Sequence, residues 1–198
     1  ALAQARQIHG QERICVSCAG IAFAAKTVDR DGNYHQPDLL NKTIGVNLIG
    51  TFNVSRQSAT GMSKAEPLND DGERGVIINT ASVAAFEGQI GQVAYAASKG
   101  ALVTMTLSLA RALGPALRIN AVCPGFIQGE WLREGLGDQQ YEAARANHGR
   151  NAPLGLTADA DTVADAILFF ITGPQIVTGE TLIVDGGRHL NSVPLARR

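Results

Sequence analysis

The chain has 198 residues, of which 45% are hydrophobic, and this suits one domain with a sizeable core. Its 17 basic and 18 acidic residues give a net charge of −1 without a basic tract, so neither nucleic acid nor a membrane is an expected partner. No apolar run approaches the ~18 residues of a transmembrane helix, and the opening residues lack the pattern of a secretory signal peptide.

The first half of the chain has the pattern of a strand followed by a long helix. An apolar run from Ile14 to Cys18 is typical of a short buried strand, and apolar residues recur at helical spacing from Asp38 to Met62. Asp31-Gly32 marks a turn between them. The expected elements are a helix end over 1–9, a strand over 14–18, a loop over 29–37, a helix over 38–62 and a charged loop over 64–74.

The second half continues the alternation of strands and helices. Each expected strand is a largely apolar run, as in strands that are buried on both faces. The expected elements are strands over 75–79, 117–123 and 181–184, and helices over 93–113, 131–148 and 161–171. This order predicts an α/β fold with a mostly parallel sheet that helices cover on both faces.

The three cysteines are an odd number and lie in apolar runs, so we expect reduced, buried thiols in an intracellular, cytoplasmic protein. Cys15 and Cys18 have the C-x-x-C spacing of redox and zinc sites. Residues three apart in a strand point to opposite faces, however, so no metal site is expected there. Three histidines show no clustering and are expected to be solvated loop residues: His35, His148 and His189.

A possible acid/base constellation lies in the middle of the chain. Tyr95 follows Ser82 by thirteen positions and Lys99 follows Tyr95 by four, which places the phenol and the ammonium on one helical face. A free tyrosine has a pKa of about 10. A neighbouring cation favours the phenolate and lowers that pKa toward neutrality, as proton transfer requires. The alternative without a catalytic role is that Tyr95 and Lys99 are an ordinary surface pair on a helix, with Ser82 as a capping or turn residue.

Further landmarks follow one another in a fixed order along the chain. They are Cys18-Ala-Gly20, Val46-Asn47-Leu-Ile-Gly50, Ser82, Tyr95-x-x-x-Lys99, Pro124-Gly125 and Val184-Asp-Gly-Gly187. With these landmarks the chain resembles the short-chain dehydrogenase/reductase superfamily from about residue 13 to 189. Its middle part is similar to the multifunctional 3-hydroxyacyl-CoA/hydroxysteroid dehydrogenases. The resemblance implies a Rossmann-like, doubly wound fold, and residues 1–198 would form a single domain of this type that lacks its first strands and helices.

The resemblance also implies four catalytic residues. Tyr95 would be the general acid/base, and Lys99 would lower its pKa and hold the nicotinamide ribose. Ser82 would bond the substrate oxygen and stabilise its developing charge. Asn47 would kink its helix and hold a water that relays the proton, or it would merely kink the chain.

The same resemblance implies binding residues for NAD or NADP and for a small-molecule alcohol or ketone. The cofactor would contact Ala19, Gly20, Tyr95, Lys99, Pro124, Gly125 and Ile127. The substrate would contact Ser82, Gln89 and Gln92, although the two glutamines are equally suited to capping their loop. Pro124-Gly125 ends a predicted strand, where ligands bind in open α/β sheets, and a simple strand stop is the alternative.

The chain departs from the family pattern in three places. Neither G-x-G-x-x-G nor Thr-Gly-x-x-x-Gly-x-Gly occurs in it, so the phosphate-binding turn and the residue that separates NAD from NADP are missing. We expect that residues ahead of Ala1 exist. Ser17 stands at a usual asparagine, and Gly129 stands at a usual threonine, whose carboxamide contact would be lost or taken over by Gln128.

We therefore expect an NAD(P)-dependent oxidoreductase that interconverts a secondary alcohol and a ketone, of the 3-hydroxyacyl-CoA or hydroxysteroid type. The alternatives are a 3-oxoacyl-carrier-protein reductase and a catalytically silent subunit that keeps the fold for binding or scaffolding. We also expect a homotetramer, because family members pair through helices that correspond to residues 38–63 and 93–113, and both segments carry extra apolar positions here.

Overall fold

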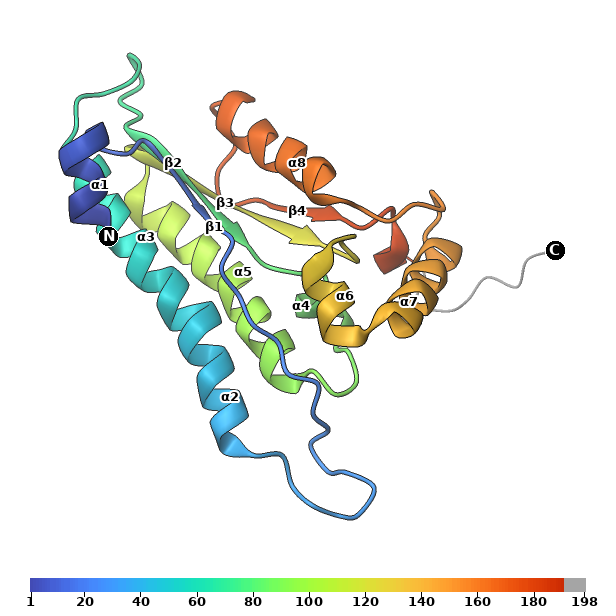
Figure 1. Ribbon diagram of the computed structural model, residues 1–198. Coiled ribbons are helices and arrows are strands. Elements are labelled where there is room, and N and C mark those ends of the chain that lie inside the picture. Colours follow the sequence, from blue (N-terminus) through green and yellow to red (C-terminus); the bar gives the residue numbers. More distant parts are fainter. Residues whose placement is uncertain (191–198) are drawn as a thin grey trace.

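The computed structural model describes residues 1–190, so the last eight residues of the domain predicted over 1–198 lie outside the described residues. Its centre is a four-stranded parallel sheet in the order β1-β2-β3-β4 (Figure 1). The strands are β1 (Ile14–Ser17), β2 (Gly75–Thr80), β3 (Leu117–Pro124) and β4 (Thr181–Val184). The predicted α/β class and parallel sheet are confirmed.

Helices connect and cover the strands. They are α1 (Leu2–His9), α2 (Pro37–Ile44), η1 (Gly45–Gly50), α3 (Thr51–Met62), α4 (Ala84–Glu87), α5 (Val93–Leu113), α6 (Glu130–Leu136), α7 (Asp138–Asn151), α8 (Ala160–Thr172) and η2 (Arg188–Leu190). Helices α3 and α5 lie on one face of the sheet and α8 lies on the other, whereas α6 and α7 lie beyond the carboxyl ends of the strands (Figure 1).

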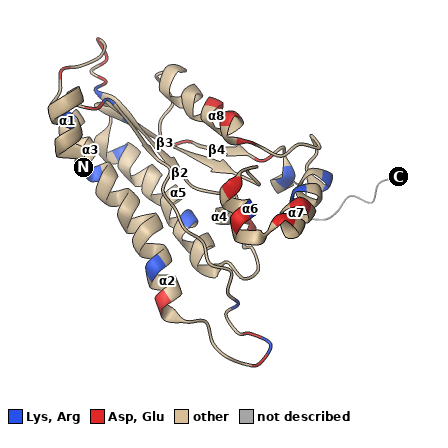
Figure 2. Cartoon of the chain, viewed as in Figure 1, with Lys and Arg blue, Asp and Glu red and all other residues tan. Residues whose placement is uncertain are grey.

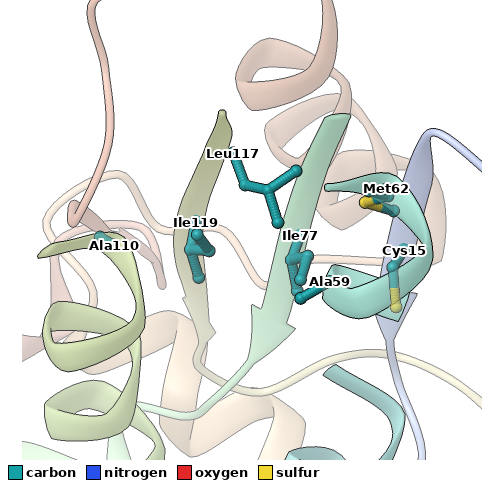
Figure 3. Packing of buried hydrophobic residues seen from close by; sticks show 7 residues of the cluster. All are labelled: Cys15, Ala59, Met62, Ile77, Ala110, Leu117 and Ile119. Atoms are coloured by element: carbon teal, nitrogen blue, oxygen red, sulfur yellow. The ribbon is translucent and has the colours of Figure 1, made fainter. Parts of the chain in front are cut away.

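The core follows from the two-residue period of the strands. Ile77 and Ile119 point toward α3 and α5, and Figure 3 shows them packed with Met62 and Leu117. The neighbouring side chains of β2 and β3 point to the other face, where they pack against Val163 and Phe170 of α8, as Val76, Ile78 and Val122 do. Alternate residues of one strand therefore serve two cores, which explains why the strands are mainly apolar on both faces.

The helix predicted over 38–62 forms, but with an interruption. Residues Gly45–Gly50 make a π-helical segment between α2 and α3, and Asn47 lies within it, completely buried. Such π turns occur frequently at functional sites. The region predicted as one loose helix over 131–148 is two helices. Gly137 ends the first of them, because its positive φ of 76° is incompatible with a continuous α-helix. Figure 2 shows charges of both signs on these two helices, which Arg133 joins through its ion pairs with Asp138 and Glu142.

Helix α5 positions much of the site described below. Among residues 1–190 it is the one helix long and apolar enough to cross a membrane by length and composition. It packs against β3 and α4, and buried helices of a protein core share this composition.

Candidate active site

A cavity of about 450 Å³ lies at the carboxyl ends of the first three strands. Ligands bind at this edge of open parallel sheets, and the volume suits a small molecule or part of a cofactor. Eight of the eleven residues predicted for catalysis or binding line it: Ala19, Gly20, Ser82, Tyr95, Lys99, Pro124, Gly125 and Ile127. The structure thus brings together residues from four separate stretches of the chain.

Ser82 and Tyr95 meet in this cavity from two different elements. Ser82 follows the end of β2 and is buried, and its Oγ accepts a hydrogen bond from the backbone N–H of Ala84 at 3.2 Å. Tyr95 lies in the first turn of α5. Burial raises the pKa of Tyr95, while a hydrogen bond with the Ser82 side chain acts in the opposite direction. The phenol is therefore protonated at neutral pH.

The spacing predicted that Lys99 lowers the pKa of Tyr95, but in the structure the pKa of Tyr95 is raised. Lys99 is 4% exposed, and its Nζ donates a hydrogen bond to the carbonyl oxygen of Thr80 at 2.7 Å. The ammonium lies 5.6 Å from the centre of the Tyr95 ring, over its face. Burial raises the pKa of Tyr95, and burial also lowers the pKa of Lys99 itself to about 8.

The buried ammonium makes stability depend on pH. The pKa of Lys99 is about 8 in the folded chain and 10.5 in an unfolded one, so the unfolded chain binds more protons between these values. In that range the free energy of unfolding of the native protein should rise with pH by about 3 kcal/mol relative to Lys99→Met. Urea unfolding of both proteins from pH 7 to pH 10 measures this difference, and parallel curves would contradict it.

Asn47 connects the segment that follows β1 to helix α5. Its Oδ1 accepts a hydrogen bond from the N–H of Ile21 at 2.8 Å, and its Nδ2 donates to the Ile21 carbonyl oxygen at 2.9 Å and to Ser98 Oγ at 3.0 Å. The side chain is therefore a clamp that holds the 19–21 segment against α5. The kink predicted at Asn47 coincides with the π-helical segment, and the water relay stays a prediction.

Gln89 and Gln92, predicted to bind substrate, are not among the described residues that line the cavity. Gln92 precedes α5, and its carbonyl oxygen accepts from the N–H of Ala96. The Nε2 of Gln89 donates to Glu87 at 3.0 Å. The proposed replacement of a carboxamide contact by Gln128 is not supported, because its Nε2 donates to Thr157 Oγ1 at 2.9 Å.

The structure adds residues to the cavity that the sequence reasoning missed. Cys18 and Thr80 lie at strand ends, and the rule that ligands bind there is the signal that would have found them. Trp131 and Leu132 come from α6, and nothing in the sequence indicates that this helix turns back over the site. Cys18 is exposed, which corrects the prediction that all three thiols are buried; Cys15 and Cys123 are buried.

The prediction of solvated loop histidines is wrong for His148. It lies in α7, where its Nε2 accepts from the N–H of Phe126 at 3.3 Å, and burial lowers its pKa. His189 also has a partner, since its Nδ1 lies 2.9 Å from a carboxylate oxygen of Asp185. Within residues 1–190 no group of three or more His, Cys, Asp or Glu side chains is arranged to hold a metal ion.

Three comparisons place this arrangement among known proteins. The chain is 52% identical over 128 residues to 3-hydroxyacyl-CoA dehydrogenase type-2 of Bos taurus, a match that covers 64% of this chain and 49% of the relative. It is 33% identical to 3-oxoacyl-[acyl-carrier-protein] reductase of Rattus norvegicus, with 78% of this chain and 58% of the relative covered. The chain thus spans about half the length of the curated relatives that it matches first.

A solved structure agrees over nearly the whole chain. The crystal structure of 3-hydroxyacyl-CoA dehydrogenase type-2 from Mycobacterium avium has a TM-score of 0.85 at 35% sequence identity, and the match covers 98% of this chain and 72% of that one. The sequence model of the family described as Enoyl-(Acyl carrier protein) reductase matches residues 1–189. With this match and with Ser82, Tyr95 and Lys99 around one cavity, the chain belongs to the short-chain dehydrogenase/reductase family.

Proposed function

We propose that this protein is an NAD(P)-dependent oxidoreductase that interconverts a secondary alcohol and a ketone of the 3-hydroxyacyl-CoA or hydroxysteroid type. The observation that carries the proposal is the convergence of Ser82, Tyr95 and Lys99 on one cavity at the carboxyl edge of the sheet. The name of the bovine relative, a 3-hydroxyacyl-CoA dehydrogenase, supports the substrate class.

The residues of the cavity fit one end of a nicotinamide cofactor. A Cβ at position 20 would lie 3.5 Å from Lys99 Nζ, so glycine leaves the space beside the ammonium open for a ribose hydroxyl. Pro124, Gly125 and Ile127 line the same cavity and would flank the nicotinamide. When bound there, NAD or NADP supplies or accepts the hydride. The glycine-rich turn that receives a pyrophosphate in dinucleotide folds has no counterpart in this sequence.

The proton chemistry belongs to this chain. In the direction of ketone reduction, the hydroxyl of Tyr95 donates its proton to the carbonyl oxygen, and the Ser82 hydroxyl donates a hydrogen bond to the same oxygen. The raised pKa of Tyr95 suits this direction, because the phenol is protonated before substrate binds. Lys99 stabilises the phenolate that remains, and in the oxidation direction each proton moves in reverse.

The complete polypeptide encoded by the gene should reduce acetoacetyl-CoA with NADH or NADPH. The expected result is a fall in absorbance at the wavelength of the reduced cofactor that depends on both substrates. The reverse assay with 3-hydroxybutyryl-CoA should show the corresponding rise. Absence of turnover with either cofactor would favour a silent subunit that keeps the fold for binding or scaffolding, and would contradict the proposal.

A reductase of carrier-protein thioesters is the second candidate, supported by the 33% identity to the rat enzyme of that name. The two candidates share the proton chemistry and differ in the group that presents the acyl chain. Assays with acetoacetyl-CoA and with the same acyl group on a carrier protein separate them. Higher kcat/KM with the carrier protein would replace the first candidate by the second.

We further propose that the protein forms homotetramers in the cytoplasm. Apolar side chains lie exposed on the outer faces of η1, α3 and α5: Val46, Ile49, Phe52, Val54, Val93 and Leu107. Pairing of these faces between copies would remove this apolar surface from water. The absence of disulfides among Cys15, Cys18 and Cys123 is consistent with a reducing compartment. Sedimentation of the complete polypeptide as a monomer only would contradict the tetramer.

A further inference from the structure

The carboxylate of Glu87 is bound by two side chains that belong to different parts of the fold. Glu87 is the last residue of α4, and its Oε1 accepts a hydrogen bond from Arg188 Nη1 at 2.8 Å. Its other oxygen accepts from Gln89 Nε2 at 3.0 Å. The side chains of Glu87 and Arg188 are only 18% and 28% exposed, so water screens this charge-assisted contact incompletely.

Arg188 is fixed to the strand end that flanks the cavity. It opens η2 directly after the turn at Asp185, whose Oδ1 accepts from the N–H of Gly187 at 2.8 Å and whose Oδ2 accepts from the N–H of His189 at 2.8 Å. The strand before this turn holds the cavity residue Gly125, whose N–H donates to the carbonyl oxygen of Val184 at 3.0 Å. Arg188 is therefore a fixed point relative to the cavity.

The loop that Glu87 could hold, residues 88–92, has little conformational preference of its own. Gly88 and Gly91 have positive φ angles of 59° and 75°, a region that few other residues enter. The loop contacts the segment after β1 at one place, the parallel bridge of Ala25 with Gln92, where the N–H of Ala25 donates to the carbonyl oxygen of Gly91 at 2.8 Å. A flexible backbone with few contacts needs side-chain bonds to adopt one geometry.

We propose that Glu87 and Arg188 form a positioning pair that sets the geometry of the 88–92 loop, which leads directly into the helix that carries Tyr95. The ion pair fixes the Glu87 carboxylate, and the carboxylate fixes the Gln89 amide. The backbone of the loop is thereby held in one conformation. The two residues are 101 positions apart, so the pair couples the segment between Ser82 and Tyr95 to the turn that follows β4. The kinetic part of this inference rests on the proposed function, whereas the structural part does not.

The test uses the complete polypeptide with Glu87→Gln, Arg188→Gln and the reversed pair, Glu87→Arg combined with Arg188→Glu. Each single variant should raise KM for the acyl substrate about tenfold and leave kcat within about twofold, because the reacting groups stay in place. The reversed pair should restore most of the KM. A carboxylate at 188 still meets a cation at 87, and the Gln89 amide can present its oxygen to that cation.

Glu12→Gln is the matched control. Arg6 Nη2 lies 2.6 Å from Glu12 Oε1. The side chains of Arg6 and Glu12 are 29% and 21% exposed, which is close to the values of the proposed pair. Helix α1 lies near the amino-terminal ends of the strands (Figure 1), whereas the cavity residues lie at their carboxyl ends, and no residue of α1 lines the cavity. An ion pair that acts only through stability would give the same kinetics in Glu12→Gln as in Glu87→Gln, and that result would overturn the proposal.

Amide hydrogen exchange provides a readout that needs no activity. The exchange of the Ala25 amide should accelerate about tenfold in both single variants and return toward the native rate in the reversed pair. If the native polypeptide showed no turnover, the proposed function would fail while this measurement still decided the positioning role. Unchanged exchange at Ala25, or failure of the reversed pair to restore it, would overturn the proposal.

Discussion

Replacement of Tyr95 by phenylalanine is expected to lower kcat/KM in either direction by roughly 10³-fold, the usual contribution of a positioned general acid. The change removes one oxygen and leaves the ring beside Lys99, so the cavity keeps its shape. Steady-state kinetics of the complete polypeptide measure the loss. Binding of the cofactor, followed by fluorescence titration, should change little, because the ammonium of Lys99 is retained.

Tyr34→Phe is the matched control for this prediction. The Tyr34 side chain is 75% exposed and lies in the loop before α2, outside the cavity lining. The same chemical change there should leave kcat/KM within about twofold of the native value. Activity of Tyr95→Phe within about tenfold of the native protein would show that another group, or water, transfers the proton.

Asn47→Leu is the second substitution with a large expected effect. It removes the amide that binds both backbone groups of Ile21 and the hydroxyl of Ser98. The two partly buried Ile21 groups lose this partner, whereas the Ser98 hydroxyl keeps its bond to the carbonyl oxygen of Tyr95. Each such group costs about 1–3 kcal/mol, so the free energy of unfolding should fall by roughly 3 kcal/mol. The kcat should fall about tenfold as well, because Asn47 holds the segment containing Gly20 next to the Lys99 ammonium.

Asn120→Leu separates the two effects of that substitution. Asn120 is also completely buried and also clamps a loop, since its Nδ2 donates to the Val177 carbonyl oxygen and its Oδ1 accepts from the N–H of Glu180, each at 3.0 Å. It does not line the cavity. Urea unfolding should show a similar loss for both variants, whereas only Asn47→Leu should reduce kcat. Equal kcat values in the two variants would contradict the positioning role of Asn47.

Most elements of the fold were predictable because they depend on local periodicity. The mainly apolar runs at 75–79 and 117–123 predicted strands buried on both faces, and β2 and β3 are such strands. The helix over 93–113 was predicted with its observed limits as α5. The π-helical segment at Asn47 and the break at Gly137 were missed, because hydrophobic spacing does not report a single altered turn.

The site was predictable where a residue type and its spacing imply chemistry. The spacing of Tyr95 and Lys99, together with the resemblance that the ordered landmarks carry, identified Ser82, Tyr95 and Lys99 as candidates, and they lie around one cavity. Their electrostatics were not predictable, because the spacing of Tyr95 and Lys99 suggests attraction while burial dominates both pKa values. Desolvation depends on every atom that surrounds a group, and those atoms come from β2, β3 and the segment after β1.

The amino-acid sequence by itself determined the alternation of strands and helices and the candidate proton-transfer residues, since the first depends on local spacing and the second on motifs in a fixed order. Only the tertiary structure decided that Trp131 and Leu132 line the cavity and that Glu87 pairs with Arg188. These contacts join segments that are far apart in the chain. Their existence depends on how the sheet and its connections bring those segments together. A pattern of neighbouring residues does not specify such long-range contacts.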